Sequence, residues 1–168
     1  MIPLFVGLTL VNLLTFAVAG GLGYMSVAGI GHNLRGWHML AGGLAGIVAC
    51  GVHCFVFTYF VATAKWIQHA VVTKKLDEAF IAPTRSFKKQ AFPAAMLAIA
   101  VSLIATFSGA ARDTRMISQT AHHAITAAAF AVNILVAIVE YRAIARNGRL
   151  IDSILATVGE SNQPTQVI

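Results

Sequence analysis

Four of the six histidines in this 168-residue chain lie inside long stretches that carry no charged side chain. They are His38, His53, His122 and His123. Imidazole binds metals and haem iron, and it also carries protons near neutral pH. In an apolar stretch, a polar side chain is costly unless it faces a buried partner or a bound group. These four positions are therefore where the sequence could do chemistry.

Small residues lie between two of these histidines. His38, Gly42, Gly46, Ala49 and His53 follow one another at steps of four, four, three and four, which keeps them on one face of a helix. A neighbouring helix could pack closely on such a face. Alternatively, the face could hold a flat macrocycle such as haem b, with one imidazole supplied by each of two helices. Both interpretations fit the spacing.

Depth in a membrane limits which histidines can share one haem. Arg35 and Arg115 mark the same end of two predicted helices; His38 lies three residues past the first marker and His122 seven past the second. At about 1.5 Å per residue, these two histidines differ in depth by roughly 6 Å, whereas His53 differs from His122 by roughly 15–16 Å. Two ligands of one iron need nearly equal depth, so His53 is the poorer partner.

The predicted haem site therefore combines the second and fourth apolar stretches. His38 would bind with either His122 or His123, and His38 and His122 are the expected ligands of the iron. Gly42 and Gly46 would lie against the macrocycle. Since His122 and His123 point about 100° apart on a helix, only one of them can face a given neighbour.

His53 has a polar neighbour at its own depth. Asn133 lies eighteen residues past its arginine marker, as His53 does past its own. A hydrogen bond across the bundle would satisfy both side chains, and Asn12 could join them. We predict this polar network for His53, which would bind a cofactor only if a second one were present. Glu140 is expected at the end of its span, paired with nearby arginines or lysines.

Cys50, His53 and Cys54 place three possible metal ligands on one helical turn, which could suit Cu(I) or zinc. Closed metal sites usually draw ligands from more than one element, and the chain has no third cysteine. We therefore expect the two cysteines to pack as small apolar side chains. The sequence also lacks a P-loop, a GxGxxG motif and an HExxH motif.

The composition is that of a membrane protein, because 58% of the residues are hydrophobic and only 11% are charged. A bilayer-spanning helix needs about 20 apolar residues, and stretches 3–27, 37–64, 92–111 and 116–139 are long enough. We predict one all-α domain over residues 1–168, an integral membrane four-helix bundle. Pro93 is expected in the first turn of the third span, where its missing N–H costs nothing.

The basic residues predict the orientation. Most of them lie in the loop 65–91 and the tail 140–168: Lys65, Lys74, Lys75, Arg85, Lys88, Lys89, Arg142, Arg146 and Arg149. This bias places both termini in the cytoplasm. It also explains the net positive charge without a nucleic-acid partner, since no basic face forms. Short interfacial helices are expected in the loop and tail, His32 should face water, and the last residues should fray.

His38 with its glycines, followed two helices later by His122 and His123, resembles the pattern of four-helix membrane cytochromes b, including the haem-carrying anchors of respiratory oxidoreductases. The resemblance implies haem b, electron transfer to or from a quinone or a redox partner, and other subunits of a larger complex. A bacterial inner membrane is the expected location.

Three other functions remain open. The chain could be a cofactor-free accessory subunit that scaffolds a larger membrane complex. It could be a small transporter that uses His53, Asn133 and Asn12. It could also bind a pigment such as bacteriochlorophyll, which needs one histidine beside small residues.

Overall fold

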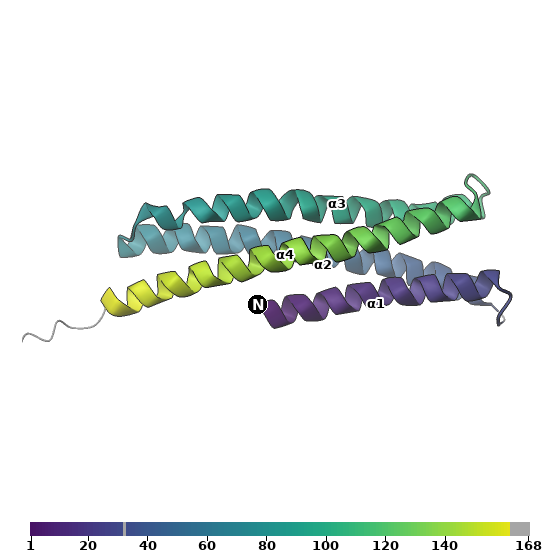
Figure 1. Ribbon diagram of the computed structural model, residues 1–168, viewed down its shortest axis with the longest axis horizontal. Helices are drawn as coiled ribbons and strands as arrows, with labels where there is room; N and C mark the ends of the chain where they lie inside the picture. Colours follow the sequence, from purple (N-terminus) through teal and green to yellow (C-terminus); the bar gives the residue numbers. More distant parts are fainter. Residues whose placement is uncertain (32, 162–168) are drawn as a thin grey trace, which may run out of the picture.

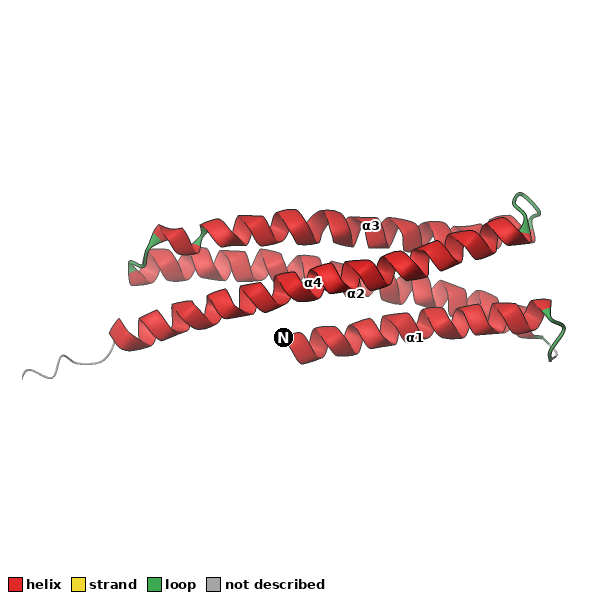
Figure 2. Cartoon of the chain, in the orientation of Figure 1, coloured by secondary structure: helices red, strands yellow, loops and turns green. Residues whose placement is uncertain are grey.

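The computed structural model describes residues 1–31 and 33–161 (Figure 1). Its elements are α1 (Ile2–Val27), α2 (Leu34–Lys74), the 3₁₀ helix η1 (Glu78–Phe80), α3 (Ala82–Asp113) and α4 (Gln119–Ser161). Over the described residues the chain is helical with short connecting loops and no strand, as Figure 2 shows. The expectations for His32 and for the last residues of the tail fall outside the described part.

All four α-helices are long and apolar enough to cross a membrane, with mean hydropathies of 1.9 to 2.1 over their most apolar windows. An α-helix satisfies its own backbone groups, which a membrane interior requires. The predicted all-α, four-helix membrane bundle is confirmed at this level. The helix α1 covers the whole of the apolar stretch 3–27.

Successive helices run in opposite directions, and each packs against its neighbours in the sequence (Figure 1). The α1–α2 and α3–α4 connections lie at one end of the bundle, and the connection between α2 and α3 lies at the other (Figure 1). We call the latter the basic end, because nearly all lysines and arginines outside Arg35, Arg112 and Arg115 lie toward it. In Figure 1, α1 begins near the middle of the bundle's length, and the other three helices continue past it.

The expected short interfacial helices are not confirmed. Their residues instead extend α2, α3 and α4, and α2 and α4 contain 41 and 43 residues. At about 1.5 Å per residue these two helices are roughly 60 Å long, about twice the hydrocarbon thickness. Ile67, Val71 and Ile154 are fully buried in the extension. Its apolar residues thus pack on neighbouring helices, so the spans need not end where the charges begin.

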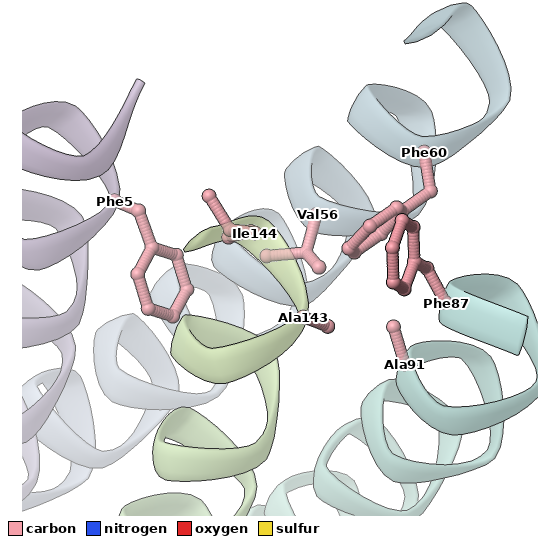
Figure 3. Close-up of a cluster of buried hydrophobic side chains, with 7 residues drawn as sticks. All are labelled: Phe5, Val56, Phe60, Phe87, Ala91, Ala143 and Ile144. Atoms are coloured by element: carbon pink, nitrogen blue, oxygen red, sulfur yellow. The ribbon is translucent and has the colours of Figure 1, made fainter. Parts of the chain in front are cut away.

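An apolar layer joins all four helices on the basic-end side of the bundle's centre (Figure 3). Its seven buried residues are Phe5, Val56, Phe60, Phe87, Ala91, Ala143 and Ile144. In Figure 3, Phe60 and Phe87 lie against each other, while Phe5 approaches Ile144 from α1. This layer separates the polar groups described below from the extension.

The expected position of Pro93 is wrong. Pro83 occupies the first turn of α3, and Pro93 lies inside the helix. An internal proline loses one backbone hydrogen bond. Here Ala91 and Ala95 on either side are completely buried in the bundle, and Phe92 stacks on Phe57 with ring centroids 3.9 Å apart. Tertiary packing therefore stabilises α3 on both sides of Pro93, and the helix continues past it.

A substitution at Gly46 tests how closely α2 and α3 pack. A Cβ atom at this position would overlap Thr106 Oγ1, whereas a Cβ at Gly51 on the same helix meets no atom within 4 Å. We expect Gly46→Ala to lower the free energy of unfolding by about 1–3 kcal/mol, as overpacking does. Gly51→Ala should leave it unchanged or raise it by up to about 1 kcal/mol through helix propensity. Thermal unfolding in detergent checks this, and equal midpoints for the two variants would contradict it.

Candidate functional site

A cavity of about 840 Å³ opens between all four helices at the end opposite the basic end. This volume lies in the range of small-molecule and cofactor sites, roughly 300–1,000 Å³. Small residues line much of it, including Gly20 and Gly23 from α1 and Gly42 from α2. His38 and His122 line it from α2 and α4. We call it the histidine cavity.

The structure brings His38 and His122 together. Their ring centroids are 6.1 Å apart and their planes are inclined at 74°. A bond between a metal and an imidazole nitrogen is about 2 Å long, so two imidazoles on opposite sides of one ion have ring centres roughly 6 Å apart. Each ring can turn about its own metal–nitrogen bond, so the inclination is compatible with such a pair. The spacing fits two axial ligands.

The hydrogen bond of His38 determines which ring nitrogen carries the hydrogen and which keeps its lone pair. His38 Nδ1 lies 2.9 Å from the backbone carbonyl oxygen of Ala19 on α1. A carbonyl oxygen only accepts, so Nδ1 carries the hydrogen and donates it. In the neutral ring, Nε2 is then left with its lone pair. A metal-binding histidine usually has this arrangement, in which its other nitrogen donates to a carbonyl group.

His122 reaches the same state through a different partner. Its Nδ1 lies 2.7 Å from Ser108 Oγ, and that hydroxyl donates its own hydrogen to the Ala105 carbonyl oxygen at 2.7 Å. Because the hydroxyl hydrogen is already used, Ser108 accepts from His122 Nδ1–H. Nε2 of His122 therefore also keeps its lone pair. His122 is only 8% exposed, so these contacts hold the ring firmly.

A glycine lies against each of the two rings. A Cβ atom on Gly23 would lie 2.7 Å from His38 Cε1, closer than real contacts allow. A Cβ atom on Gly109 would lie 3.7 Å from His122 Cε1, an ordinary contact distance. Gly23 is thus required where α1 approaches His38, because a side chain at this position would displace the ring.

His123 is placed differently from its neighbour. It is exposed, it borders the cavity, and its ring centroid lies 6.1 Å from that of His122. Of the two candidates on α4, His122 is the one that faces His38. Haem binding by His38 with either of them stays a prediction.

The two glycines of the predicted groove have different environments. Gly42 lines the cavity, with open space where a side chain would be. Gly46 packs on Thr106 of α3, so here the helix-packing interpretation describes the contact. His53 lies outside the lining of the cavity.

His53 is the centre of a buried polar network. Its Nε2 lies 3.1 Å from Asn133 Oδ1, and Asn12 Nδ2 donates to the same oxygen at 3.0 Å. These are the contacts predicted from depth. Asn133 Nδ2 also donates to Ser102 Oγ at 3.0 Å. With Glu140, described next, the polar network consists of Asn12, His53, Ser102, Asn133 and Glu140, and every α-helix contributes to it.

The expectation for Glu140 is wrong. Its side chain does not pair with arginines or lysines; Oε1 lies 2.9 Å from His53 Nδ1, and the residue is fully buried. Glu140 follows Asn133 by seven residues, or about two helical turns, so both lie on nearly the same face. Since the predicted span ended at residue 139, Glu140 was assigned to the water boundary, but α4 continues as a core helix.

The structure gives His53 other partners than Cys50 and Cys54. Both ring nitrogens of His53 are used by Asn133 and Glu140, and Cys54 is exposed while Cys50 is half-buried. Within the described residues, no group of three or more His, Cys, Asp or Glu side chains could hold a metal ion.

No family model matches the sequence, and no curated protein or solved structure matches it either. The function must therefore be inferred from the residues of the cavity and of the polar network.

Asn133 is the residue whose loss should damage the network most. Asn133→Leu leaves the hydrogen-bonding groups of His53, Asn12 and Ser102 without a partner, and each such group costs about 1–3 kcal/mol when buried. Ser102→Ala removes one of these contacts, and Asn133 Nδ2 keeps its second bond to the Ala129 carbonyl at 2.9 Å. Thermal unfolding in detergent should show a clearly larger loss for Asn133→Leu. Similar losses would show that the network does not act as a unit.

Proposed function

We propose that this protein is a membrane-embedded b-type cytochrome, an electron-carrying subunit in which His38 and His122 bind haem b in the histidine cavity. The observation that supports this best is the state of the two rings. Each imidazole uses Nδ1 for a hydrogen bond within the bundle and keeps Nε2 available, and the ring centres have the separation expected of two axial ligands.

The cavity residues have separate tasks in this function. Ala19 and Ser108 orient the two rings, and the small residues leave room for a flat ligand. Phe16 and Phe130 line the cavity and pack together with ring centroids 6.2 Å apart, which excludes water. Haem b bound there would supply one-electron redox chemistry, with its potential set by ligands, hydrogen bonds and burial.

Charged residues at the mouth of the cavity suit the carboxylates of haem b. Arg35 and Arg112 both border it. Arg35 forms an exposed ion pair with Asp113 at 2.6 Å. Asp113 also borders the cavity, so Arg35 is already paired with a carboxylate there. Guanidinium groups bind carboxylates in a bidentate manner, so Arg112 is the arginine that can hold the acidic edge of the ligand at the water boundary while its apolar part lies in the bundle.

The orientation follows from the excess of basic residues. If the basic end is cytoplasmic, both termini are cytoplasmic and the haem lies near the outer face of the membrane. Bacterial inner membranes have this charge rule, which is our basis for proposing that location. A quinone dissolved in the bilayer or another subunit of a membrane complex is the proposed electron partner.

A cofactor-free accessory subunit is the second candidate. It is favoured by the extension of α2, α3 and α4 beyond α1, which offers a surface to other subunits. A single-histidine pigment would leave one of the two available Nε2 atoms unused, and it is the weaker alternative for the cavity.

The absorption spectrum of the protein purified after expression with ample haem tests the proposal. Wild type should show the reduced-minus-oxidised bands of a six-coordinate b-type haem. His38→Ala and His122→Ala should abolish these bands, because each removes a ligand. His123→Ala is the matched control on α4 and should retain them. Absence of haem in wild type, together with copurification of fixed partners, would favour the accessory subunit.

Gly23 tests the fit between α1 and the ligand histidine. Gly23→Ala puts a methyl group into the His38 ring position, so the ring must move and haem occupancy should fall several-fold. Gly7→Ala adds a methyl group to the same helix outside the lining of the cavity, where no atom lies within 4 Å, and occupancy should stay at the wild-type level. The haem-to-protein ratio measures this. Equal ratios in the two variants would show that α1 does not position His38.

A further inference from the structure

Glu140 is unusual among the acidic residues of the chain. It is fully buried, whereas the other acidic side chains that the structure describes are exposed or half-buried. A carboxyl group in the membrane interior is expensive and is therefore a functional-site candidate. The haem site does not use it, because its partner is His53 in the polar network.

The hydrogen bonds determine how many protons His53 and Glu140 hold together. Asn133 Nδ2 donates to the Ala129 carbonyl oxygen, which fixes the amide so that Oδ1 faces His53. His53 Nε2 must then be a donor and carry a hydrogen. The 2.9 Å contact between Nδ1 and Glu140 Oε1 needs one further proton, because two lone pairs would repel each other. In either position of this shared proton, the pair is neutral overall.

The same cluster has unused acceptor atoms. The buried side-chain atoms without a hydrogen-bond partner in the described chain are Thr9 Oγ1, Asn12 Oδ1 and Glu140 Oε2. Asn12 and Glu140 belong to the polar network, and Thr9 precedes Asn12 by one helical turn on α1. Buried acceptors of this kind normally have a donor. Glu140 Oε2 can therefore take a second proton without giving up an existing bond.

The polar network lies close to the histidine cavity. Thr106 lines the cavity and donates to the Ser102 carbonyl oxygen one helical turn away. On α4, Phe130 lines the cavity three residues before Asn133. One turn of helix corresponds to about 5.4 Å, so the near edge of the network lies about one turn from the lining. His53 lies eight residues past Ala45 of the lining and Glu140 ten residues past Phe130, so the pair itself is roughly 12–15 Å farther along the bundle. A charge placed in the cavity is thus felt by the network through a medium of low dielectric constant, where screening is weak.

We propose that the His53–Glu140 pair is an internal proton-binding site, which takes up one proton from water when one electron enters the histidine cavity and releases it when the electron leaves. This proposal rests on the proposed function in one respect: the electron comes from a one-electron donor to haem b. Charge is balanced in the step: one negative charge arrives in the cavity, and the neutral pair gains one positive charge.

Few other side chains near the His53–Glu140 pair can gain or lose a proton. Neither α1 nor residues 91–111 of α3 contains Asp, Glu, His, Lys or Arg. The titratable side chains of α2 and α4 nearest to the pair in sequence are Cys50, Cys54, Tyr59, Tyr141 and Arg142. Cys54, Tyr141 and Arg142 are exposed, and Tyr59 accepts a hydrogen bond from Asn147 at 3.0 Å. A change in the protonation of Glu140 can therefore be followed individually.

Infrared difference spectroscopy tests the proton site with or without haem. Wild type in lipid nanodiscs should show a carboxyl C=O band that changes with pH and shifts in D₂O. The band should be absent from Glu140→Gln, which keeps the shape of the side chain. Asp152→Asn, at an exposed acid on the same helix, should retain it. If Glu140→Gln does not fold, ¹³C-glutamate labelling of a Glu78→Gln/Glu160→Gln chain, which keeps Glu140 as its one glutamate, identifies the band instead. No Glu140-dependent change at any pH would overturn the proposal.

Potentiometric titration tests the link to the electron. The haem midpoint potential of wild type and Asp152→Asn should fall as pH rises, by up to about 59 mV per tenfold change in proton concentration. Glu140→Gln should lose most of this dependence. An unchanged dependence in Glu140→Gln would overturn the link. If wild type binds no haem, the proposed function fails, and the infrared titration alone then decides whether the pair binds a proton.

Discussion

The structure depends on one constraint: inside a membrane, each polar side chain must find its partner within the protein. Asn133 meets this constraint for the centre of the bundle, because its amide binds His53 and Asn12 on one side and Ser102 on the other. These contacts connect all four helices at one depth. Apolar packing alone cannot select such an alignment, since lipid chains are as apolar as the helices. The hydrogen bonds therefore set the register in which the remaining layers form.

From this register the bundle divides into layers along its length. The histidine cavity lies on one side of the polar network, where glycines on α1 and α2 leave space between the helices because they have no side chain. The apolar layer lies on the other side, where Phe5, Phe60 and Phe87 fill the space between the helices. The volume of the side chains thus decides where the bundle is open and where it is closed. The polar network and the apolar layer hold the four helices together next to the cavity, where fewer side chains pack between them.

Much of this could be predicted from the sequence, for physical reasons. Long uncharged stretches predict the spans, and counting residues from Arg35 and Arg115 predicts that His38 and His122 differ by only about 6 Å in depth, since rise per residue is nearly constant. The extension of the helices was missed because charge was taken as the end of a span, although Ile67 and Ile154 pack on other helices. Glu140 was missed for the same reason. The contacts of Ser108 and Gly23 depend on helix rotation and close approach, which no local pattern in one sequence contains.

The histidines inside the bundle are of two kinds, which differ in the ring nitrogens that their partners leave available. His38 Nδ1 donates to a carbonyl oxygen, and His122 Nδ1 donates to Ser108 Oγ, whose own hydrogen is used elsewhere. Each ring is therefore held in one tautomer, and Nε2 keeps its lone pair. For His53 both nitrogens are used, and the partner at Nδ1 is a group that can itself hold the proton. A ring with an available lone pair suits a metal, whereas a ring that shares its proton with a carboxyl group suits proton binding. The chain therefore holds the two kinds of histidine in different layers, one with an available lone pair and one that shares its proton with a carboxyl group.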